Sequence, residues 1–209
     1  MSVHVKVCGF TRPGDVTAAV EAGVDCFGFN LAKGPRRLDL ERAAALAALV
    51  PTDRSRVALF IDADEDAIQR AMAATGCDTV QLHGDAPPEM AASLAGRYRV
   101  FRAFRIRDAA SLKAVVGYPA HVYLLDAWVP GAEGGTGETW DHSLLAGRDL
   151  GRPLMLAGGL TPDNVAEAVA TVRPWGVDTA SGVEGDEPGL KDHAKVRAYV
   201  EKARRAAAC

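Results

Sequence analysis

The stretch that decides the fold is Leu156-Ala157-Gly158-Gly159-Leu160-Thr161-Pro162, which places two glycines between an apolar, strand-like run and a helix start. Glycine lets backbone N–H groups approach an anion without a Cβ in the way, and a helix N-terminus adds a favourable partial charge. A similar stretch, Ala180-Ser181-Gly182-Val183-Glu184, follows the next strand-like run. Either turn could be a plain tight turn, but two on adjacent units favour a phosphate site formed by Gly158, Gly159, Ser181 and Gly182.

The rest of the chain alternates between strand-like and helix-like patterns. Hydrophobic runs predict strands over residues 4–8, 26–30, 57–61, 79–83, 99–104, 121–126, 154–157 and 176–180. Helical patterns fall between them, over residues 16–22, 40–49, 65–74, 88–94, 109–116, 141–145, 162–172 and 193–207. Candidate N-caps precede three of these helices, namely Thr11, Asp108 and Thr161.

Eight strand–helix units predict a parallel sheet, because parallel strands need crossover connections. Such a sheet can close into a barrel or remain open and doubly wound. Phosphate sites after strands seven and eight recur in (β/α)8 enzymes, and both glycine turns lie there. We therefore expect one α/β domain over residues 1–209, a single (β/α)8 TIM barrel.

The bulk properties indicate no nucleic-acid or membrane partner. The net charge of −3 and a pI of about 6.0 offer no basic footprint for nucleic acid or an anionic membrane. The N-terminal stretch lacks an apolar signal region, and no apolar run approaches the ~20 residues of a spanning helix. Four scattered cysteines without CxxC or Cys/His clustering argue against disulfides and zinc. We expect a cytoplasmic protein without a metal site, either monomer or homodimer.

Two reactive side chains close apolar runs at matching positions. Cys8 follows the run 3–7 and Asp126 follows the run 122–125. The carboxyl ends of parallel strands share one mouth of the sheet, where α/β enzymes keep their chemistry. We therefore expect a proton-transfer pair with Cys8 as base and Asp126 as acid. The alternative for Cys8 is a small inert core residue. That alternative suits the other three cysteines better, namely Cys26, Cys77 and Cys209. Only Cys8 precedes a glycine turn at this end of the sheet.

Two loops carry further candidates. Lys33-Gly34-Pro35-Arg36-Arg37 supplies cations that can grip a carboxylate or phosphate bidentately, or that form a solvated basic loop. The segment Gly131-Ala132-Glu133-Gly134-Gly135-Thr136-Gly137 follows Asp126 and suits a loop that closes over substrate, or a linker without ligand contact.

Taken together, these motifs resemble one family. Val5-Lys6-Val7-Cys8-Gly9-Phe10-Thr11 resembles the opening of phosphoribosylanthranilate isomerase from tryptophan biosynthesis. Its later motifs are matched in order by Phe27-Gly28-Phe29, Pro35-Arg36, Val80-Gln81-Leu82-His83-Gly84, Leu125-Asp126, Gly134-Gly135-Thr136-Gly137, Leu156-Ala157-Gly158-Gly159-Leu160, Ser181-Gly182-Val183-Glu184 and Pro188-Gly189-Leu190-Lys191-Asp192. The resemblance implies an aldose–ketose isomerase without metal or cofactor. It implies the Amadori rearrangement of a phosphorylated aminosugar to 1-(2-carboxyphenylamino)-1-deoxyribulose 5-phosphate.

The resemblance also implies residue roles. Asp126 matches the general acid that protonates the furanose ring oxygen, and Cys8 matches the base that takes the proton from the sugar C2. Each role requires a pKa closer to neutrality than the ordinary values of about 3.9 and 8.5. Arg36 matches the arginine near the anthranilate carboxylate. The segment 30–34 is slightly short and lacks the family's aromatic residue, which leaves Arg37 as an alternative.

Two further residues each have two possible roles. His83 lies in the matched Gln-Leu-His-Gly motif and either lines the site or is structural. Asp178 is a candidate for an inward-facing substrate contact or for a structural hydrogen-bonding residue.

Two other functions compete with this interpretation. The related isomerase of the histidine pathway resembles the phosphate loops but has Asp rather than Cys after strand one, so Cys8 argues against it. A non-catalytic barrel that binds a phosphorylated ligand need not keep Cys8 and Asp126 together.

Overall fold

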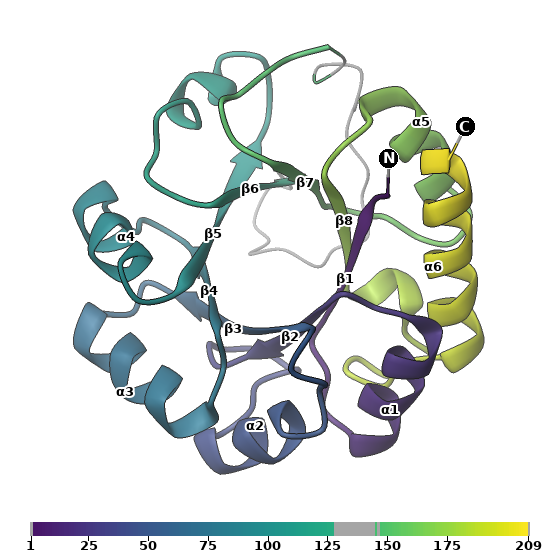
Figure 1. Cartoon of the computed structure of the whole chain (residues 1–209), viewed down its shortest axis with the longest axis horizontal. Helices are drawn as coiled ribbons and strands as arrows, with labels where there is room; N and C mark the ends of the chain where they lie inside the picture. The colour runs from purple at the N-terminus through teal and green to yellow at the C-terminus, as the bar shows by residue number, and fades with distance from the viewer. Residues whose placement is uncertain (1, 128–144, 146, 209) are drawn as a thin grey trace.

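The computed structural model describes residues 2–127, 145 and 147–208, and its eight parallel strands close into a barrel (Figure 1). The strands pair in chain order and the last returns to the first. They are β1 (His4–Cys8), β2 (Cys26–Asn30), β3 (Ser55–Ile61), β4 (Thr79–His83), β5 (Arg99–Ile106), β6 (Val122–Ala127), β7 (Leu154–Leu156) and β8 (Gly176–Thr179). The expected TIM barrel is confirmed, with strand ends shifted by at most two residues.

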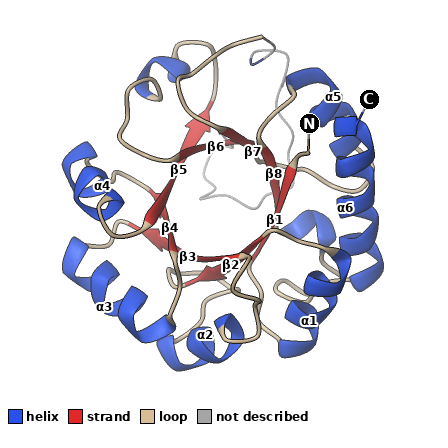
Figure 2. Cartoon of the chain, in the orientation of Figure 1, coloured by secondary structure: helices blue, strands red, loops and turns tan. Residues whose placement is uncertain are grey.

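Helices surround the barrel on its outside (Figure 2). They are α1 (Pro13–Ala22), α2 (Leu40–Ala47), α3 (Glu65–Thr75), α4 (Pro88–Ala95), α5 (Val165–Val172) and α6 (His193–Ala208), joined by the 3₁₀ turns η1 (Ser111–Ala114) and η3 (Ser181–Val183). None of the described helices is long and apolar enough to cross a membrane.

Several expected helix features differ from the structure. The helix expected over 109–116 is only the short turn η1, although Asp108 does accept a hydrogen bond from the Ser111 amide at its start. Thr11 caps no helix, because its hydroxyl donates to the carbonyl of Gly189 instead. Helix α5 begins at residue 165, so Thr161 is not its N-cap. The helix expected over 141–145 and the glycine-rich segment 131–137 lie, apart from Leu145, outside the described residues.

Alternation along the strands separates two cores. On β1, Val5 and Val7 pack outward with the helices, while Lys6 and Cys8 take the opposite parity and point into the barrel. A compact inner layer made of Cys26, Val57, Phe101, Ala103, Val122, Leu124, Met155 and Ala157 fills the barrel interior, with Trp175 against it. Such layers make a TIM barrel a packed core rather than a pore. A packed interior leaves only the ends of the barrel for a binding site, and TIM-barrel enzymes use the carboxyl ends of the strands.

Candidate functional site

A cavity of about 380 Å³ lies at the carboxyl ends of the strands. Five of the residues predicted from the sequence line it together: Cys8, Arg36, His83, Asp126 and Asp178. Gln81, Leu124 and Ala180 are among its other walls. The four predicted phosphate residues are not among the lining residues of this cavity. Ser181 and Gly182 directly follow the lining residue Ala180, whereas Gly158 and Gly159 lie in the turn after β7, which is not part of the cavity lining.

Cys8 ends β1 and its exposed fraction is 7%. Its register partner on β2 is Gly28, where an added Cβ would lie 2.6 Å from the Cys8 Sγ and 2.9 Å from its Cα. Real Cβ atoms do not approach so closely, so the thiol depends on the bare backbone of Gly28 for its space.

The other described cysteines lie elsewhere and differ chemically. Cys26 belongs to the inner apolar layer, and burial raises the pKa of its thiol to about 11. Burial also raises the pKa of Cys77, which precedes β4 in the chain. Neither of them lines the cavity, so position separates Cys8 from both.

Asp126 lies near the end of β6 and lines the same cavity as Cys8. In the closed order of the barrel, β7 and β8 separate β6 from β1. The carboxyl group and the thiol therefore reach one cavity from strands that are not neighbours. This arrangement lets an acid and a base act on different atoms of one bound molecule.

Lys6 and Asp178 form a buried ion pair below the cavity mouth. The Lys6 side chain is fully buried and its Nζ donates to Asp178 Oδ1 at 3.0 Å. Burial by itself lowers the pKa of Lys6, but the adjacent carboxylate outweighs it and raises the pKa overall. Lys6 is therefore a permanent cation. Lys6 shares the inward parity of Cys8, but its sequence pattern predicts no role for it.

His83 is a neutral imidazole at the cavity wall. Burial, together with the positive charges of Lys6 and Arg102, lowers the pKa of His83 to about 3. Its Nε2 lies 2.7 Å from Nε2 of Gln81, two residues earlier on β4. The Gln81 Oε1 is buried and has no hydrogen-bond partner in the described part of the chain. Gln81 also lines the cavity but was not predicted from the sequence. It lies two residues before His83 on the same strand, so its side chain faces the same side, and this spacing could have identified it.

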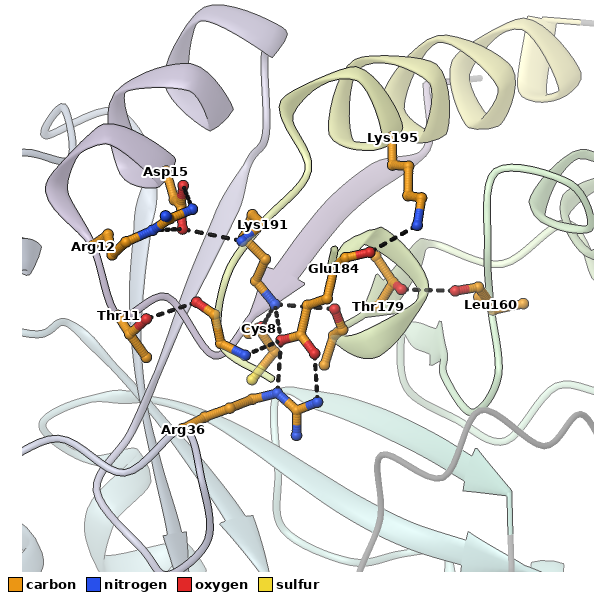
Figure 3. A network of polar contacts seen from close by, with 12 residues as sticks. Cys8, Thr11, Arg12, Asp15, Arg36, Leu160, Thr179, Glu184, Lys191 and Lys195 are labelled. Carbon is orange, nitrogen blue, oxygen red and sulfur yellow. Dashed lines mark hydrogen bonds and ion pairs between the residues drawn. The ribbon is translucent and has the colours of Figure 1, made fainter. Parts of the chain in front are cut away.

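Arg36 reaches the cavity, whereas Arg37 does not line it. Arg37 is exposed and pairs through its backbone with Asn30. The Arg36 guanidinium forms a bidentate ion pair with Glu184. Its Nε donates to Oε1 at 2.7 Å and its Nη2 donates to Oε2 at 2.6 Å (Figure 3). Of the two arginines considered from the sequence, Arg36 is therefore the one that lies at the cavity.

The turns that follow β7 and β8 pack against each other. Gly158 and Gly159 both have positive φ, 88° and 65°, in the region that favours glycine. The hydroxyl of Thr179 donates to the carbonyl of Leu160 at 2.7 Å, and a Cβ on Gly182 would overlap that same carbonyl oxygen. Close contact of two glycine turns beside a helix start is a geometry that can cradle an anion with backbone N–H groups.

The comparison with known proteins fits this geometry. The family model described as N-(5'phosphoribosyl)anthranilate (PRA) isomerase matches residues 5–202. The chain belongs to the PRA isomerase family. The N-(5'-phosphoribosyl)anthranilate isomerase of Citrifermentans bemidjiense is 46% identical over 206 residues, which cover 97% of this chain and 98% of the relative.

Solved structures of PRA isomerases share the whole barrel. The phosphoribosyl anthranilate isomerase of Thermotoga maritima aligns with a TM-score of 0.91 at 35% identity, over 97% of this chain and 99% of that one. A PRA isomerase in complex with reduced 1-(o-carboxyphenylamino)-1-deoxyribulose 5-phosphate aligns with a TM-score of 0.88 at 33% identity, over the same shares.

Membership of the PRA isomerase family confirms the expected activity. The chain is an isomerase of tryptophan biosynthesis on a (β/α)8 barrel. The histidine-pathway isomerase and the non-catalytic barrel considered from the sequence are thereby set aside.

Proposed function

We propose that Cys8 and Asp126 carry the two proton transfers of the PRA isomerase reaction in this chain. The observation that supports this most is that one cavity is lined by both residues, with a cationic side chain at the same cavity. Asp126, as the acid, gives a proton to the furanose ring oxygen. The C1–O bond then breaks, the ring oxygen becomes a hydroxyl group, and C1 becomes part of a protonated Schiff base.

Cys8, as the thiolate, then takes the proton from the sugar C2. The electrons of that C–H bond form a C1–C2 double bond, which neutralises the Schiff-base nitrogen and gives an enolamine. Tautomerisation moves a proton to C1 and leaves a carbonyl at C2, so the product is the aminoketone. The chain supplies acid, base and anion-binding groups itself, so we propose that the reaction needs no metal or cofactor.

The two anionic ends of the substrate are assigned to different parts of the barrel mouth. We assign the anthranilate carboxylate to Arg36, from the loop after β2, because a guanidinium binds carboxylates in a planar, bidentate manner. The phosphate is assigned to backbone N–H groups of Gly158, Gly159, Ser181 and Gly182. His83 and Asp178 line the cavity and are assigned to the sugar hydroxyls that lie between the two ends.

The remaining assignments concern the whole chain. We propose that residues 1–209 act as one barrel domain in the cytoplasm, as a monomer or homodimer. The phosphorylated aminosugar is its small-molecule partner, and no nucleic acid or membrane takes part.

The experiment is a coupled assay of matched cysteine variants. PRA is generated in situ from anthranilate and phosphoribosyl pyrophosphate, and its fluorescence is followed after the enzyme is added. Cys8→Ala is expected to lose most turnover yet still bind the reduced product analogue. Cys77→Ala, which removes a thiol outside the cavity, is expected to keep turnover near wild type. Near-full kcat in Cys8→Ala would overturn the assignment of the base.

A further inference from the structure

We propose that Glu184 and Lys191 are positioning residues for Arg36. In this arrangement Lys191 fixes the Glu184 carboxylate, and Glu184 aims the Arg36 guanidinium so that one of its edges stays open to the substrate carboxylate. The inference rests on the role proposed above for Arg36, and it names the residues that make this role specific.

The Glu184 carboxylate is saturated with donors. Its Oε1 accepts hydrogen bonds from Arg36 Nε, from Lys191 Nζ at 2.9 Å and from the Gly189 amide at 2.9 Å, while Oε2 accepts from Arg36 Nη2. Its exposed fraction is only 5%. Burial raises the pKa of Glu184, but the hydrogen bond from Arg36 and the charge of Lys191 lower it overall, so the group is ionised. A carboxylate held by four donors has one orientation.

That orientation fixes which edge of Arg36 is used. Glu184 occupies the edge formed by Nε and Nη2, and the described residues make no further hydrogen bond to the guanidinium. The edge formed by Nη1 and the second N–H of Nη2 is left for a ligand at the cavity that Arg36 lines. With two cations and one carboxylate, the cluster carries a net positive charge that a ligand carboxylate would neutralise.

Lys191 connects this cluster to the proposed base. Its side chain is fully buried, and its ammonium donates to Cys8 O at 2.7 Å, to Ala180 O at 3.0 Å and to Glu184 Oε1 (Figure 3). An ammonium has three N–H donors, so all three are used. One side chain therefore ties the end of β1, the residue after β8 and the anchor of Arg36 together.

The loop that carries these residues is itself anchored. Glu184 and Lys191 form an antiparallel backbone bridge, and the Lys191 amide donates to Asp15 Oδ2 on α1. Asp15 is also held by Arg12 through two hydrogen bonds. The positions of the proposed carboxylate-binding arginine and of the proposed base are thus set from the same point on the barrel rim.

The test compares Glu184→Gln with Glu187→Gln, which removes an exposed charge from the same loop. Glu184→Gln is expected to raise the KM for PRA and the Kd for the reduced product analogue about tenfold to hundredfold, the range of a lost charged hydrogen bond. The kcat should fall less, and the Kd for ribulose 5-phosphate, which lacks the carboxylate, should stay within about twofold of wild type. Glu187→Gln should behave as wild type. Equal loss of affinity for both ligands in Glu184→Gln would overturn the inference.

Comparing Arg36→Ala with Glu184→Gln separates this inference from the role of Arg36 itself. If Arg36→Ala binds the product analogue as wild type does, the proposed role of Arg36 is wrong. If Arg36→Ala loses affinity and Glu184→Gln does not, only the positioning inference fails.

Arg36→Lys tests the aim of the guanidinium while Glu184 and Lys191 themselves are left unchanged. Lysine keeps the positive charge but cannot form the bidentate ion pair with Glu184. The loss of affinity for the reduced product analogue should therefore approach that of Arg36→Ala. Near-wild-type affinity in Arg36→Lys would overturn the inference even if Glu184→Gln fails to fold.

Discussion

Lys6 on β1 and Asp178 on β8 are register partners, and their buried ion pair of 3.0 Å crosses the seam where the last strand of the barrel meets the first. Lys6 also neighbours Cys26 of the inner apolar layer in register, on β2. On the other side of the pair, Asp178 lines the cavity. The pair therefore joins the apolar interior of the barrel to the site above it.

Breaking this pair from one side should be costly. Lys6→Met leaves the Asp178 carboxylate without its partner, and an unpaired buried charge typically costs about 3–5 kcal/mol of the free energy of unfolding. Lys6→Met combined with Asp178→Leu removes both charges and should recover most of that loss. Urea unfolding of the single and double variants measures both effects. Turnover should stay low in the double variant, because the cavity has lost Asp178, and a stable, fully active double variant would contradict that role.

Asp126→Asn keeps the shape of the side chain and removes its transferable proton. Loss of a general acid commonly lowers the rate by ~10²–10⁴-fold. The decrease should appear in kcat more than in KM, because the carboxyl group acts on charge that develops in the transition state. A change confined to KM would make Asp126 a binding residue. Steady-state kinetics with PRA generated in situ distinguishes the two.

His83 should make the fold sensitive to mild acid. The pKa of His83 is about 3 in the folded protein, against an ordinary value of 6.5. Between pH 3 and pH 6.5, the imidazole is therefore protonated in the unfolded chain and neutral in the folded protein. Its contribution to stability is complete above pH 6.5 and is lost as the pH falls, with a limiting slope of about 1.4 kcal/mol per pH unit. His83→Gln removes this slope.

The measurement is the difference in the free energy of unfolding between wild type and His83→Gln, from pH 7 to about 4.5, which stays above the ordinary pKa values of Asp and Glu. Burial also lowers the pKa of His4 and His121, but both proteins contain these residues and their contributions cancel. A pH-independent difference would mean that His83 titrates normally in the folded protein.

Gly182→Ala tests the assignment of the phosphate. The added methyl group would overlap the Leu160 carbonyl oxygen and push apart the turns that follow β7 and β8. Affinity for inorganic phosphate and for ribulose 5-phosphate should fall about tenfold or more, equivalent to at least about 1.4 kcal/mol. Gly185→Ala is the control, because its methyl group would meet nothing closer than the Leu190 carbonyl at 4.0 Å. Arg36→Ala should leave the affinity for inorganic phosphate unchanged, and a loss there would place Arg36 at the wrong end of the substrate.

The strands and the residues at their ends could be predicted from the sequence because the information is local. Apolar runs closed by Cys8, His83 and Asp126 placed these side chains at one mouth, and the structure has them around one cavity. The turn η1 is shorter than the expected helix, and its buried Leu112, with Val115 directly after it, has a spacing that suits both a helix and a 3₁₀ turn.

What could not be predicted depends on contacts between distant parts of the chain. The Thr11 hydroxyl would suit an N-cap, yet the carbonyl of Gly189 lies within its reach and takes the hydrogen bond. The anchor of Arg36 comes from Glu184, 148 positions later. Such pairings are decided by how the barrel closes, and a local pattern carries no sign of them.

The close approach of Gly28 to Cys8 has a consequence for how sequences of this enzyme can diverge. Gly28 does not line the cavity, yet any side chain there would occupy the volume of the proposed base. Among random variants selected for growth without tryptophan, position 28 should tolerate as little change as position 8. In such a collection, Gly28 would look like a catalytic residue, although it has no side chain and leaves the space beside the Cys8 sulfur atom open.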